Sequence, residues 1–299
     1  MGLLKSIICA SRLRTLPLAL SCIITGHAMA YYLGAFHWVV FNLCILTTLL
    51  LQILSNFSND LGDSEKGTDN EARIGPKRAI QSGMLSPDEM KKMLKAMIGL
   101  ALISGILLLL FSNILWWEKL ILLAVGLGAI WAAMNYTQGN VAYGYRAFGD
   151  IFVFLFFGII GVLGSLFLNI HQINNAAFLP AIGVGCLAVC VLHLNNMRDL
   201  INDAHSDKIT VAIKLGFENS RIYFVLLILA AITSWSSYVF TQNVTNYFSF
   251  IYWIGFIPLI FIVIRFLRLK ELKDFDLLLK PTALTTFLLS ILFFISQIF

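Results

Sequence analysis

Two groups of acidic residues stand shortly after long apolar stretches of the sequence. Asp60 and Asp63 follow "FNLCILTTLLLQILS", and Asp199 and Asp203 follow "AIGVGCLAVCVLHL". Like charges four residues apart destabilise a helix by about 0.2–0.5 kcal/mol per pair. A carboxylate drawn to the bilayer centre costs up to about 2.5–3.5 kcal/mol. Both groups are therefore locally unfavourable unless a cation offsets their charge.

An asparagine precedes each acidic group by one helical turn. If helix continues past the apolar stretches, residues three or four apart share a face. Two such faces are predicted, one formed by Asn56, Asp60 and Asp63, the other by Asn195, Asp199, Asp203 and Asp207. Carboxylate and amide oxygens suit Mg2+, which takes one or two carboxylates and completes its shell with water and phosphate oxygens. We predict Mg2+ bound around a diphosphate, with Asp69 and Asp207 as secondary ligands; ordinary solvated loop acids are the alternative.

The elements that position these acids are predicted to be membrane-spanning helices. Of the 299 residues, 59% are hydrophobic and 12% are charged, with a mean hydropathy of +0.84; a soluble protein carries about 25% charged residues. Continuous apolar runs of about 17–22 residues fit helices and not barrel strands. We predict an all-α, polytopic membrane protein, a single domain over residues 1–299 with nine spans near 16–34, 38–57, 92–112, 116–136, 150–168, 177–196, 222–241, 248–267 and 282–298.

Charge is distributed unevenly between the two sides of these spans. Of 21 Lys and Arg residues only Lys119 falls on the side of the short loops, and of 16 Asp and Glu residues only Glu118 does. Basic residues concentrate in cytoplasmic loops. The N-terminus and both acidic groups are therefore predicted to be cytoplasmic, and the C-terminus outside. The net charge of +5 is an orientation signal, and no nucleic-acid binding is predicted.

Cysteines and histidines do not predict a second site. The five cysteines lie in or beside apolar runs with no C-x-x-C pair, which favours packing over disulfides or zinc. The five histidines form no ligand pair. The first apolar run leads into further spans without a small-residue cleavage signature, so a cleaved signal peptide is not expected.

At these residues the sequence resembles the UbiA superfamily of intramembrane prenyltransferases, over nearly the whole chain. The family's two motifs, N-D-x-x-D and D-x-x-x-D, look like Asn59-Asp60-Leu61-Gly62-Asp63 and Asp199-Leu200-Ile201-Asn202-Asp203. Four further segments resemble the 1,4-dihydroxy-2-naphthoate polyprenyltransferases of menaquinone synthesis: "NDLGDSEKGTDNEARIGPKRAIQSG", "NNMRDLINDAHSDKITVAIKLG", "YTQGNVAYGYRAFGDIFVFLFFG" and "SRLRTLPLAL". The sequence departs from that branch at Leu13, Arg14, Ala147-Phe148 and the spacer before Lys208, without losing a carboxylate.

The resemblance implies Mg2+-dependent transfer of a polyprenyl chain from polyprenyl diphosphate to 1,4-dihydroxy-2-naphthoate, with loss of CO2, giving demethylmenaquinol. It implies metal binding by Asp60, Asp63, Asp199 and Asp203, and a contact of Tyr145 with the ring or the cation. The implied substrate-binding residues are Arg12, Asn56, Asn59, Lys77, Arg78, Arg146, Asn195, Asn196, Arg198 and Lys208. A bacterial cytoplasmic (inner) membrane is implied, with lipid as a partner and no protein partner. Because a polyprenyl tail is too long for a closed pocket, we expect a central cavity open to the cytoplasm and laterally to lipid.

Other interpretations stay open from the sequence. Lys77, Arg78 and Arg146 also fit the ordinary basic excess of cytoplasmic loops, and Tyr145 fits an interface anchor. A secondary transporter would carry charges or broken helices in mid-span, whereas the middle of each of these spans is free of charge. A CDP-alcohol phosphotransferase would place its aspartates in one local segment. Within the family, prenylation of 4-hydroxybenzoate is the nearest alternative.

Overall fold

Nine helical stretches of the computed structural model are long and apolar enough to cross a membrane, counted over the described residues 3–71, 73–242 and 247–299. They are Lys5–Tyr32, Trp38–Glu65, Pro87–Phe111, Trp116–Asn135, Gly149–Ile170, Asn175–Arg198, Val211–Val239, Tyr247–Arg268 and Leu272–Ser296. Each contains most of one predicted span, so the predicted all-α membrane fold is confirmed.

The helical segments have bounds that differ from the hydropathy pattern mainly at the ends of the spans. In chain order they are α1 (Leu3–Ser11), η1 (Leu13–Thr15), α2 (Leu16–Tyr32), α3 (Trp38–Glu65), α4 (Pro87–Phe111), α5 (Trp116–Asn135), η2 (Tyr143–Tyr145), α6 (Gly149–Val153), η3 (Phe154–Leu163), α7 (Gly164–Ile170), η4 (Asn175–Ala177), α8 (Phe178–Arg198), α9 (Leu200–His205), α10 (Val211–Val239), η5 (Tyr247–Gly255), α11 (Phe256–Arg268), η6 (Leu272–Phe275) and α12 (Asp276–Ser296). The fifth span is continuous through α6, the π-helical η3 and α7.

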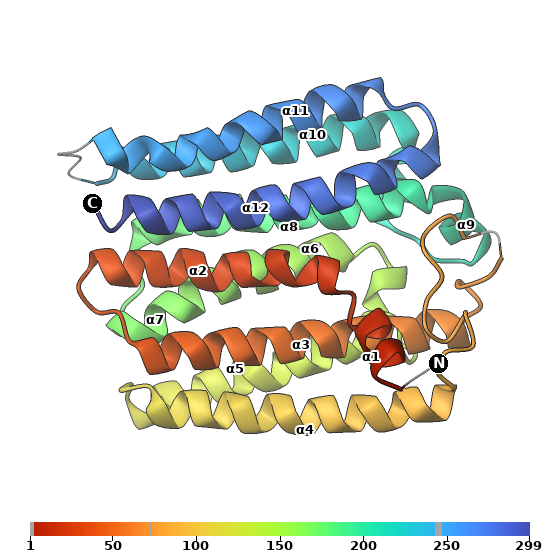
Figure 1. Ribbon diagram of the computed structural model, residues 1–299, viewed down its shortest axis with the longest axis horizontal. Helices are drawn as coiled ribbons and strands as arrows, with labels where there is room; N and C mark the ends of the chain where they lie inside the picture. Colours follow the sequence, from red (N-terminus) through yellow and green to blue (C-terminus); the bar gives the residue numbers. More distant parts are fainter. Residues whose placement is uncertain (1–2, 72, 243–246) are drawn as a thin grey trace.

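Helix α8 forms the centre of the larger part of the bundle. It packs against α10, η3 and α12, and 72% of its apolar window is buried, the largest fraction among the spans of the described chain. Gly158 of η3 and Gly185 of α8 allow the close approach, since a Cβ on Gly158 would lie 2.8 Å from the Gly185 Cα. Helices α4 and α5 pack with α3 at the other edge of the bundle (Figure 1).

The long loops gather at one end of the bundle together with α1 and α9, and the C-terminus lies at the opposite end (Figure 1). Helix α3 continues past the predicted span end at 57 to Glu65, so Asp60 and Asp63 are helical as expected. After α8 the helix is interrupted at Asp199 and resumes as the short α9. Asp207 follows α9 with a left-handed φ of 51°. It therefore leaves the single helical face that its spacing predicted.

We expect the 66–86 loop and Phe299 to lie on opposite sides of the membrane, because an odd number of spans lies between them along the chain. A reporter inserted in the 66–86 loop should be cytoplasmic, and one fused after Phe299 should be outside. A reporter fused after Asn113, in the turn between α4 and α5, is the control and should match Phe299. The same side for the 66–86 loop and Phe299 would refute the nine-span topology.

Candidate active site

The first acidic group sits at the end of α3, beneath the 66–86 loop. Asp60 and Asp63 are 2% and 1% exposed. The Asp60 carboxylate accepts the backbone N–H groups of Ala79 and Ile80 at 3.0 and 3.4 Å. Asp60 therefore anchors the loop over the helix end, while the Asp63 carboxylate lies closer to the second acidic group.

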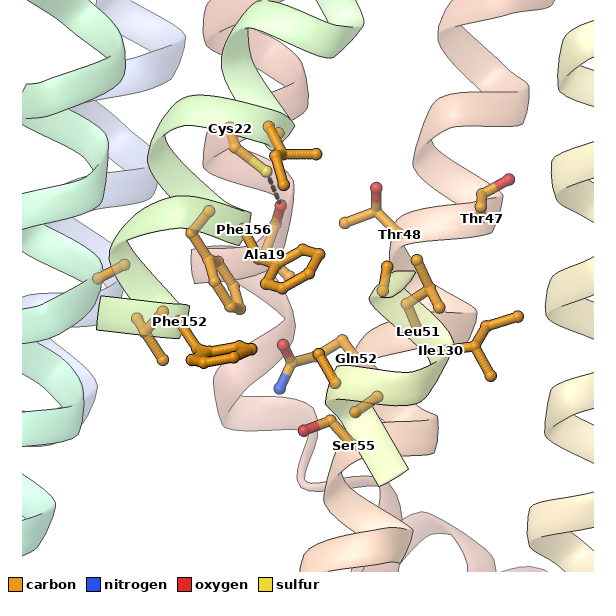
Figure 2. A pocket seen from close by; sticks show the side chains of 18 of the residues that line it. Ala19, Cys22, Thr47, Thr48, Leu51, Gln52, Ser55, Ile130, Phe152 and Phe156 are labelled. Atoms are coloured by element: carbon orange, nitrogen blue, oxygen red, sulfur yellow. Dashed lines mark hydrogen bonds between the residues drawn. The ribbon is translucent and has the colours of Figure 1, made fainter. Parts of the chain in front are cut away.

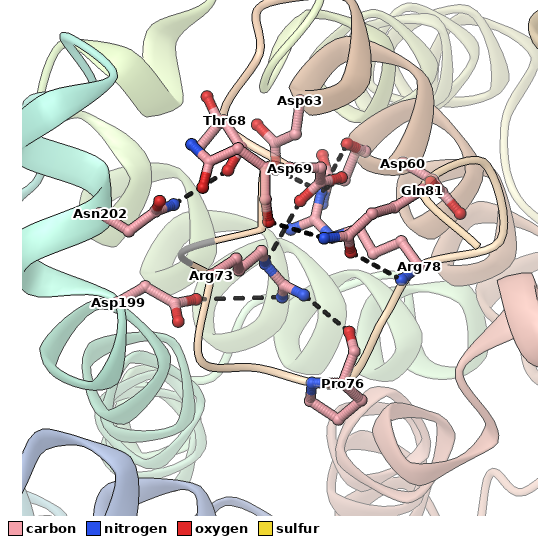
Figure 3. A network of polar contacts seen from close by, with 12 residues as sticks. Asp60, Asp63, Thr68, Asp69, Arg73, Pro76, Arg78, Gln81, Asp199 and Asn202 are labelled. Carbon is pink, nitrogen blue, oxygen red and sulfur yellow. Dashed lines mark hydrogen bonds and ion pairs between the residues drawn. The ribbon is translucent and has the colours of Figure 1, made fainter.

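Two arginines of the 66–86 loop reach down to the carboxylates (Figure 3). Arg78 forms ion pairs with Asp63 and, at 3.0 Å, with Asp69. Arg73 lies 3.2 Å from Asp69 and 3.9 Å from Asp199, so it links the two acidic groups. Burial lowers the pKa of Arg73. Burial acts in the same direction on Arg78, but the charges of Asp63 and Asp69 more than reverse this and raise its pKa.

The second acidic group spans the break between α8 and α9. Arg198 is fully buried and holds Asp199 with Nε and Nη2 at 2.9 and 2.6 Å. Its Nη1 binds Asp276 of α12 at 2.5 Å, and Nη2 also donates to Asn195. Burial opposes ionisation of Asp199, but the hydrogen bonds from Arg198 dominate and lower its pKa. All nitrogens of the Arg198 guanidinium group already have partners, so the side chain fixes the position of Asp199, and its contact with the substrate stays a prediction.

Asp203 lies one helical turn after Asp199 and is 1% exposed. Its cationic partner is Lys208, whose Nζ lies 3.5 Å from Asp203 and 3.8 Å from Asp63. Burial raises the pKa of Asp203 to about 6, against the opposing charge of Lys208. Lys208 thus forms a second link between the two acidic groups, in addition to Arg73.

Tyr145 joins the same network through a short backbone bridge. Arg146 pairs with Ile209 in a parallel bridge, in which Ile209 donates its N–H to the Tyr145 carbonyl at 3.2 Å. The Tyr145 hydroxyl donates to Asp63 at 2.7 Å and also lies 2.5 Å from Thr68 Oγ1. Burial and the neighbouring Asp63 raise the pKa of Tyr145. The hydroxyl is thus directed at a carboxylate, and the contact of Tyr145 with the acceptor ring or the allylic cation stays a prediction.

Oxygen atoms suited to a divalent cation are present in this network. Buried oxygens without a hydrogen-bond partner belong to Asn196, Asn202 and Asp203. Both oxygens of Asp69 are also buried, but each forms an ion pair, Oδ1 with Arg73 and Oδ2 with Arg78. Among the described residues, however, no three Asp, Glu, His or Cys side chains converge on one point that could hold a metal ion. Guanidinium groups of Arg73 and Arg78 stand between the carboxylates and supply the counter-charge. The donor types fit Mg2+, with phosphate oxygens and water completing its shell.

A cavity of about 420 Å³ extends from this network into the bundle. Its polar end carries Asp63, Arg78 and Lys208, together with Arg12, Arg14, Asn56, Asn59, Tyr136, Asn195 and Lys280. Its remaining wall is mostly apolar. In Figure 2, Phe152 and Phe156 of the fifth span lie across the cavity from Leu51 of α3 and Ile130 of α5. One molecule with a charged head and an apolar tail could therefore bind in this cavity, with its head at the polar end and its tail along the apolar wall.

Several predicted residues hold this polar end in place. Asn56 donates to the Ser11 carbonyl and to Thr15 at 2.9 and 3.1 Å, which fixes the turn before α2. Asn59 contributes its carbonyl to Arg78. Arg12, with a left-handed φ of 47°, lines the cavity and has a buried Nη2 without a hydrogen-bond partner.

Three predicted residues lie outside the cluster. Lys77 and Asp207 are exposed, although each adjoins a buried basic residue in sequence. Arg146 is exposed and donates to the Asn140 carbonyl at 2.8 Å. In an irregular loop the spacing of residues does not show which side chains are buried. The sequence alone therefore did not distinguish the exposed Lys77 from the buried Arg78.

Other residues of the network were not among the predicted site residues. Arg73 begins the "RIGPKR" run, and Asn202 lies inside the second motif, so both carried a signal in the sequence. Asn202 donates to the Thr68 carbonyl at 2.9 Å and so ties α9 to the 66–86 loop. No sequence motif near Asp276 indicated a role for it, because its partner Arg198 lies in another helix.

Comparison with known proteins agrees with the motifs. A model of the UbiA prenyltransferase family matches residues 19–294. The 1,4-dihydroxy-2-naphthoate octaprenyltransferase of Haemophilus influenzae is 42% identical over 245 residues, which cover 77% of this chain and 79% of that protein. The enzyme of the same name from Escherichia coli is 41% identical over 221 residues, covering 74% of this chain and 72% of that protein.

Solved structures share the fold at low sequence identity. A UbiA homologue from Archaeoglobus fulgidus bound to GPP and Mg2+ superposes with a TM-score of 0.62 at 17% identity, covering 97% of this chain and all of that one. The apo structure of a UbiA homologue from Aeropyrum pernix gives a TM-score of 0.64 at 13% identity, covering 100% of this chain and 98% of that one. The arrangement of the spans is therefore that of the UbiA fold.

Replacing Arg78 by Gln should destabilise the protein strongly in the absence of divalent cations. Removing one partner of a buried charge pair costs about 3–5 kcal/mol, because Asp63 and Asp69 would keep uncompensated charge. Mg2+ should raise the melting temperature of Arg78→Gln more than that of the wild type. Lys77→Gln, one residue earlier and exposed, is the matched control. An equal loss in both variants would contradict the proposed counter-charge role.

Proposed function

The chain belongs to the UbiA prenyltransferase family, and from that premise we propose that it transfers a polyprenyl chain from polyprenyl diphosphate to 1,4-dihydroxy-2-naphthoate with release of CO2. One observation carries the proposal: a single cavity has Asp63, Arg78 and Lys208 at one end and apolar side chains along the rest. The relatives that are 41–42% identical over most of the chain support this acceptor.

The diphosphate would bind at the polar end of the cavity. Asp63, Asp199 and Asp203, with Asp60 and Asp69 beside them, would hold Mg2+, which would neutralise charge on the leaving diphosphate. Arg78 can bind phosphate oxygens through two N–H groups, and Lys208 acts as a point charge. Both cations already lie beside the carboxylates, so little rearrangement separates their present ion pairs from contacts with phosphate oxygens. Stabilising the developing negative charge raises the rate of ionisation.

The aromatic acceptor would bind next to the diphosphate, deeper than the acidic groups. Arg12 is suited to its carboxylate, because its buried Nη2 lacks a partner and its side chain lines the cavity. Tyr136, Tyr143 and Phe152 supply aromatic surface in the same part of the wall. Tyr143 stacks on Phe152 with ring centroids 3.9 Å apart, so the acceptor ring would bind against this aromatic surface and not between its members. Aromatic faces also stabilise an allylic carbocation.

The bond changes balance without an added oxidant or reductant. The allylic C–O bond breaks, and its electron pair leaves with the diphosphate. The carboxyl-bearing ring carbon then attacks the allylic carbon and forms a C–C bond. Loss of CO2 returns the electron pair of the C–carboxylate bond to the ring, so the carboxylate carbon leaves in place of a proton. The two para hydroxyls of the acceptor make its ring strongly nucleophilic.

The charge asymmetry supports a location in the bacterial cytoplasmic membrane with the acidic end facing the cytoplasm. Soluble acceptor and diphosphate head would then enter from the cytoplasm, and the prenyl tail from the lipid.

Replacing Asp63 or Asp199 by Asn should abolish most turnover, even when the amount of folded protein is matched to that of the wild type. Each change removes a buried carboxylate from the proposed Mg2+ site. We expect turnover to fall at least a hundredfold, because removing one group that stabilises charge in the transition state costs about 2.7–4 kcal/mol. Asp60→Asn should also lose turnover, by loosening the 66–86 loop. Asp207→Asn is the matched control and should retain activity, since Asp207 is exposed. Turnover near the wild-type rate in the Asp63 and Asp199 variants would sink the metal assignment.

The acceptor is tested with membranes containing the protein, Mg2+, octaprenyl diphosphate and either aromatic acid. We expect 1,4-dihydroxy-2-naphthoate to give a prenylated product that has lost the mass of CO2, and 4-hydroxybenzoate to react poorly because its ring is less activated. Arg12→Gln should raise KM for the acceptor more than for the diphosphate. Prenylated 4-hydroxybenzoate with its carboxylate retained, as the main product, would overturn the acceptor assignment.

A further inference from the structure

Exposed basic side chains lie where α10 begins and α11 ends. Segments 211–221 and 265–274 together carry six basic and three acidic residues. Among the residues that the structure describes, no carboxylate forms an ion pair with the five exposed ones. These five, which we call the basic patch, are Lys214, Arg265, Arg268, Lys270 and Lys273. The patch therefore keeps uncompensated positive charge.

The end of α11 does not need the arginines of the patch. Cations near a helix C-terminus bond to its last carbonyls and offset its dipole. Arg221 of α10 already does so, because it donates to the Leu267 carbonyl and, at 3.3 Å, to the Leu269 carbonyl. Within the described chain, Arg265 and Arg268 form no side-chain hydrogen bond and are exposed. Their guanidinium groups are free to bind a ligand.

A row of exposed apolar side chains leads along α11 to the patch. Ile257, Phe261 and Ile264 share one face at i, i+4 and i+7 and are 53%, 65% and 41% exposed. Arg265 and Arg268 continue this face, one turn after Phe261 and Ile264. The helix rises about 16 Å from Ile257 to Arg268, about half of a hydrocarbon core of about 30 Å. Acyl chains of one leaflet would therefore lie along the apolar row, with the headgroup at the patch.

The end of α11 lies on the side of the acidic groups. Figure 1 shows α11 ending near α9, at the end of the bundle where the long loops gather. The connection to α12 leads within a few residues to Asp276, which binds Arg198. The patch is nevertheless separate from the cavity, because none of its five residues lines it.

We propose that the basic patch binds the headgroup of an anionic phospholipid in the leaflet on the side of the acidic groups. A guanidinium group can bind phosphate oxygens through two N–H groups, so Arg265 and Arg268 would hold the phosphodiester. The three lysines would supply charge beside it. A zwitterionic headgroup carries its own cation, which the patch repels, so lipids with net negative charge are selected. This site does not depend on the reaction proposed above.

A lipid bound at the patch would stabilise the connection between α11 and α12. Lys273 lies in η6, which ends directly before Asp276. A headgroup that contacts both the last turn of α11 and Lys273 would restrain this connection. Because the lipid binds the folded chain, it should raise the melting temperature.

The proposal is tested with purified protein in a neutral detergent, titrated with dioleoyl phosphatidylglycerol or dioleoyl phosphatidylcholine. Native mass spectrometry counts the bound lipids, and thermal unfolding measures stabilisation. We expect phosphatidylglycerol to bind at least about tenfold more tightly, since each basic residue near an anionic lipid contributes about fivefold in affinity. Arg265→Gln/Arg268→Gln should weaken its binding by about 25-fold and leave phosphatidylcholine unaffected. Gln and Arg have similar helix propensities, so the double variant should fold.

Lys91→Gln/Lys92→Gln on α4 is the matched control. Both lysines are exposed at the same end of the bundle, but Lys91 pairs with Glu65 at 3.2 Å and Glu89 stands one turn before Lys92. This variant should change phosphatidylglycerol binding by less than about twofold. Equal binding of the two lipids, or equal weakening in both double variants, would overturn the proposal. Displacement of phosphatidylglycerol by an equal concentration of inorganic phosphate would also overturn it, because the acyl chains would then contribute nothing.

Discussion

Burial of opposite charges at one end of a membrane bundle is the constraint on which the other features depend. Asp60, Asp63, Asp199 and Asp203 are each 1–3% exposed, and isolated carboxylates in such surroundings cost several kcal/mol. Backbone N–H groups offset this cost for Asp60, and arginine or lysine side chains offset it for the other three carboxylates. The 66–86 loop therefore has to fold over the helix ends, because it supplies both the N–H groups and two of the arginines. Cations and carboxylates are thereby held in reach of one cavity, which is what the proposed diphosphate site requires.

The two arginine groups have different physical roles. Arg198 has partners at every nitrogen, including Asp276 on another helix, so moving it would expose several buried charges at once. Arg73 and Arg78 belong to a loop, and each contacts carboxylates from more than one part of the chain. Gly75 lies between these groups, where a Cβ would approach the Arg198 and Arg73 guanidinium groups to 2.6 and 2.8 Å. The loop thus packs closely against the Arg198 network, and under the proposed function its own arginines are the groups that would exchange carboxylate for phosphate.

Periodic features could be predicted from the sequence, and features of irregular backbone could not. Hydropathy located all nine spans, and helical spacing placed Asp60 and Asp63 correctly, because α3 continues regularly to Glu65. The same rule misplaced Asp207, since a left-handed turn ends the helical register after α9. Tyr145 was identified from a motif, but the bridge between Arg146 and Ile209 joins loops that are distant in sequence and directs its hydroxyl to Asp63. Asp276 was not predicted, because its importance comes from a contact between helices.

The roles of glycines within regular helices could not be predicted from the sequence either. Gly183 and Gly126 both stand in apolar spans, and the residues around them do not show which of the two lies at a helix contact. A Cβ on Gly183 would lie 2.2 Å from Trp235, whereas one on Gly126 would meet nothing within 4 Å. What separates the two is the neighbouring helix: α8 is surrounded by α10, η3 and α12, whereas α5 has only α3 and α4 as major neighbours. A glycine in the centre of the bundle therefore allows close helix packing, whereas Gly126 at the edge leaves unfilled space. The centre and the edge of the bundle thus use the same residue type differently, because they are built from different sets of helix contacts.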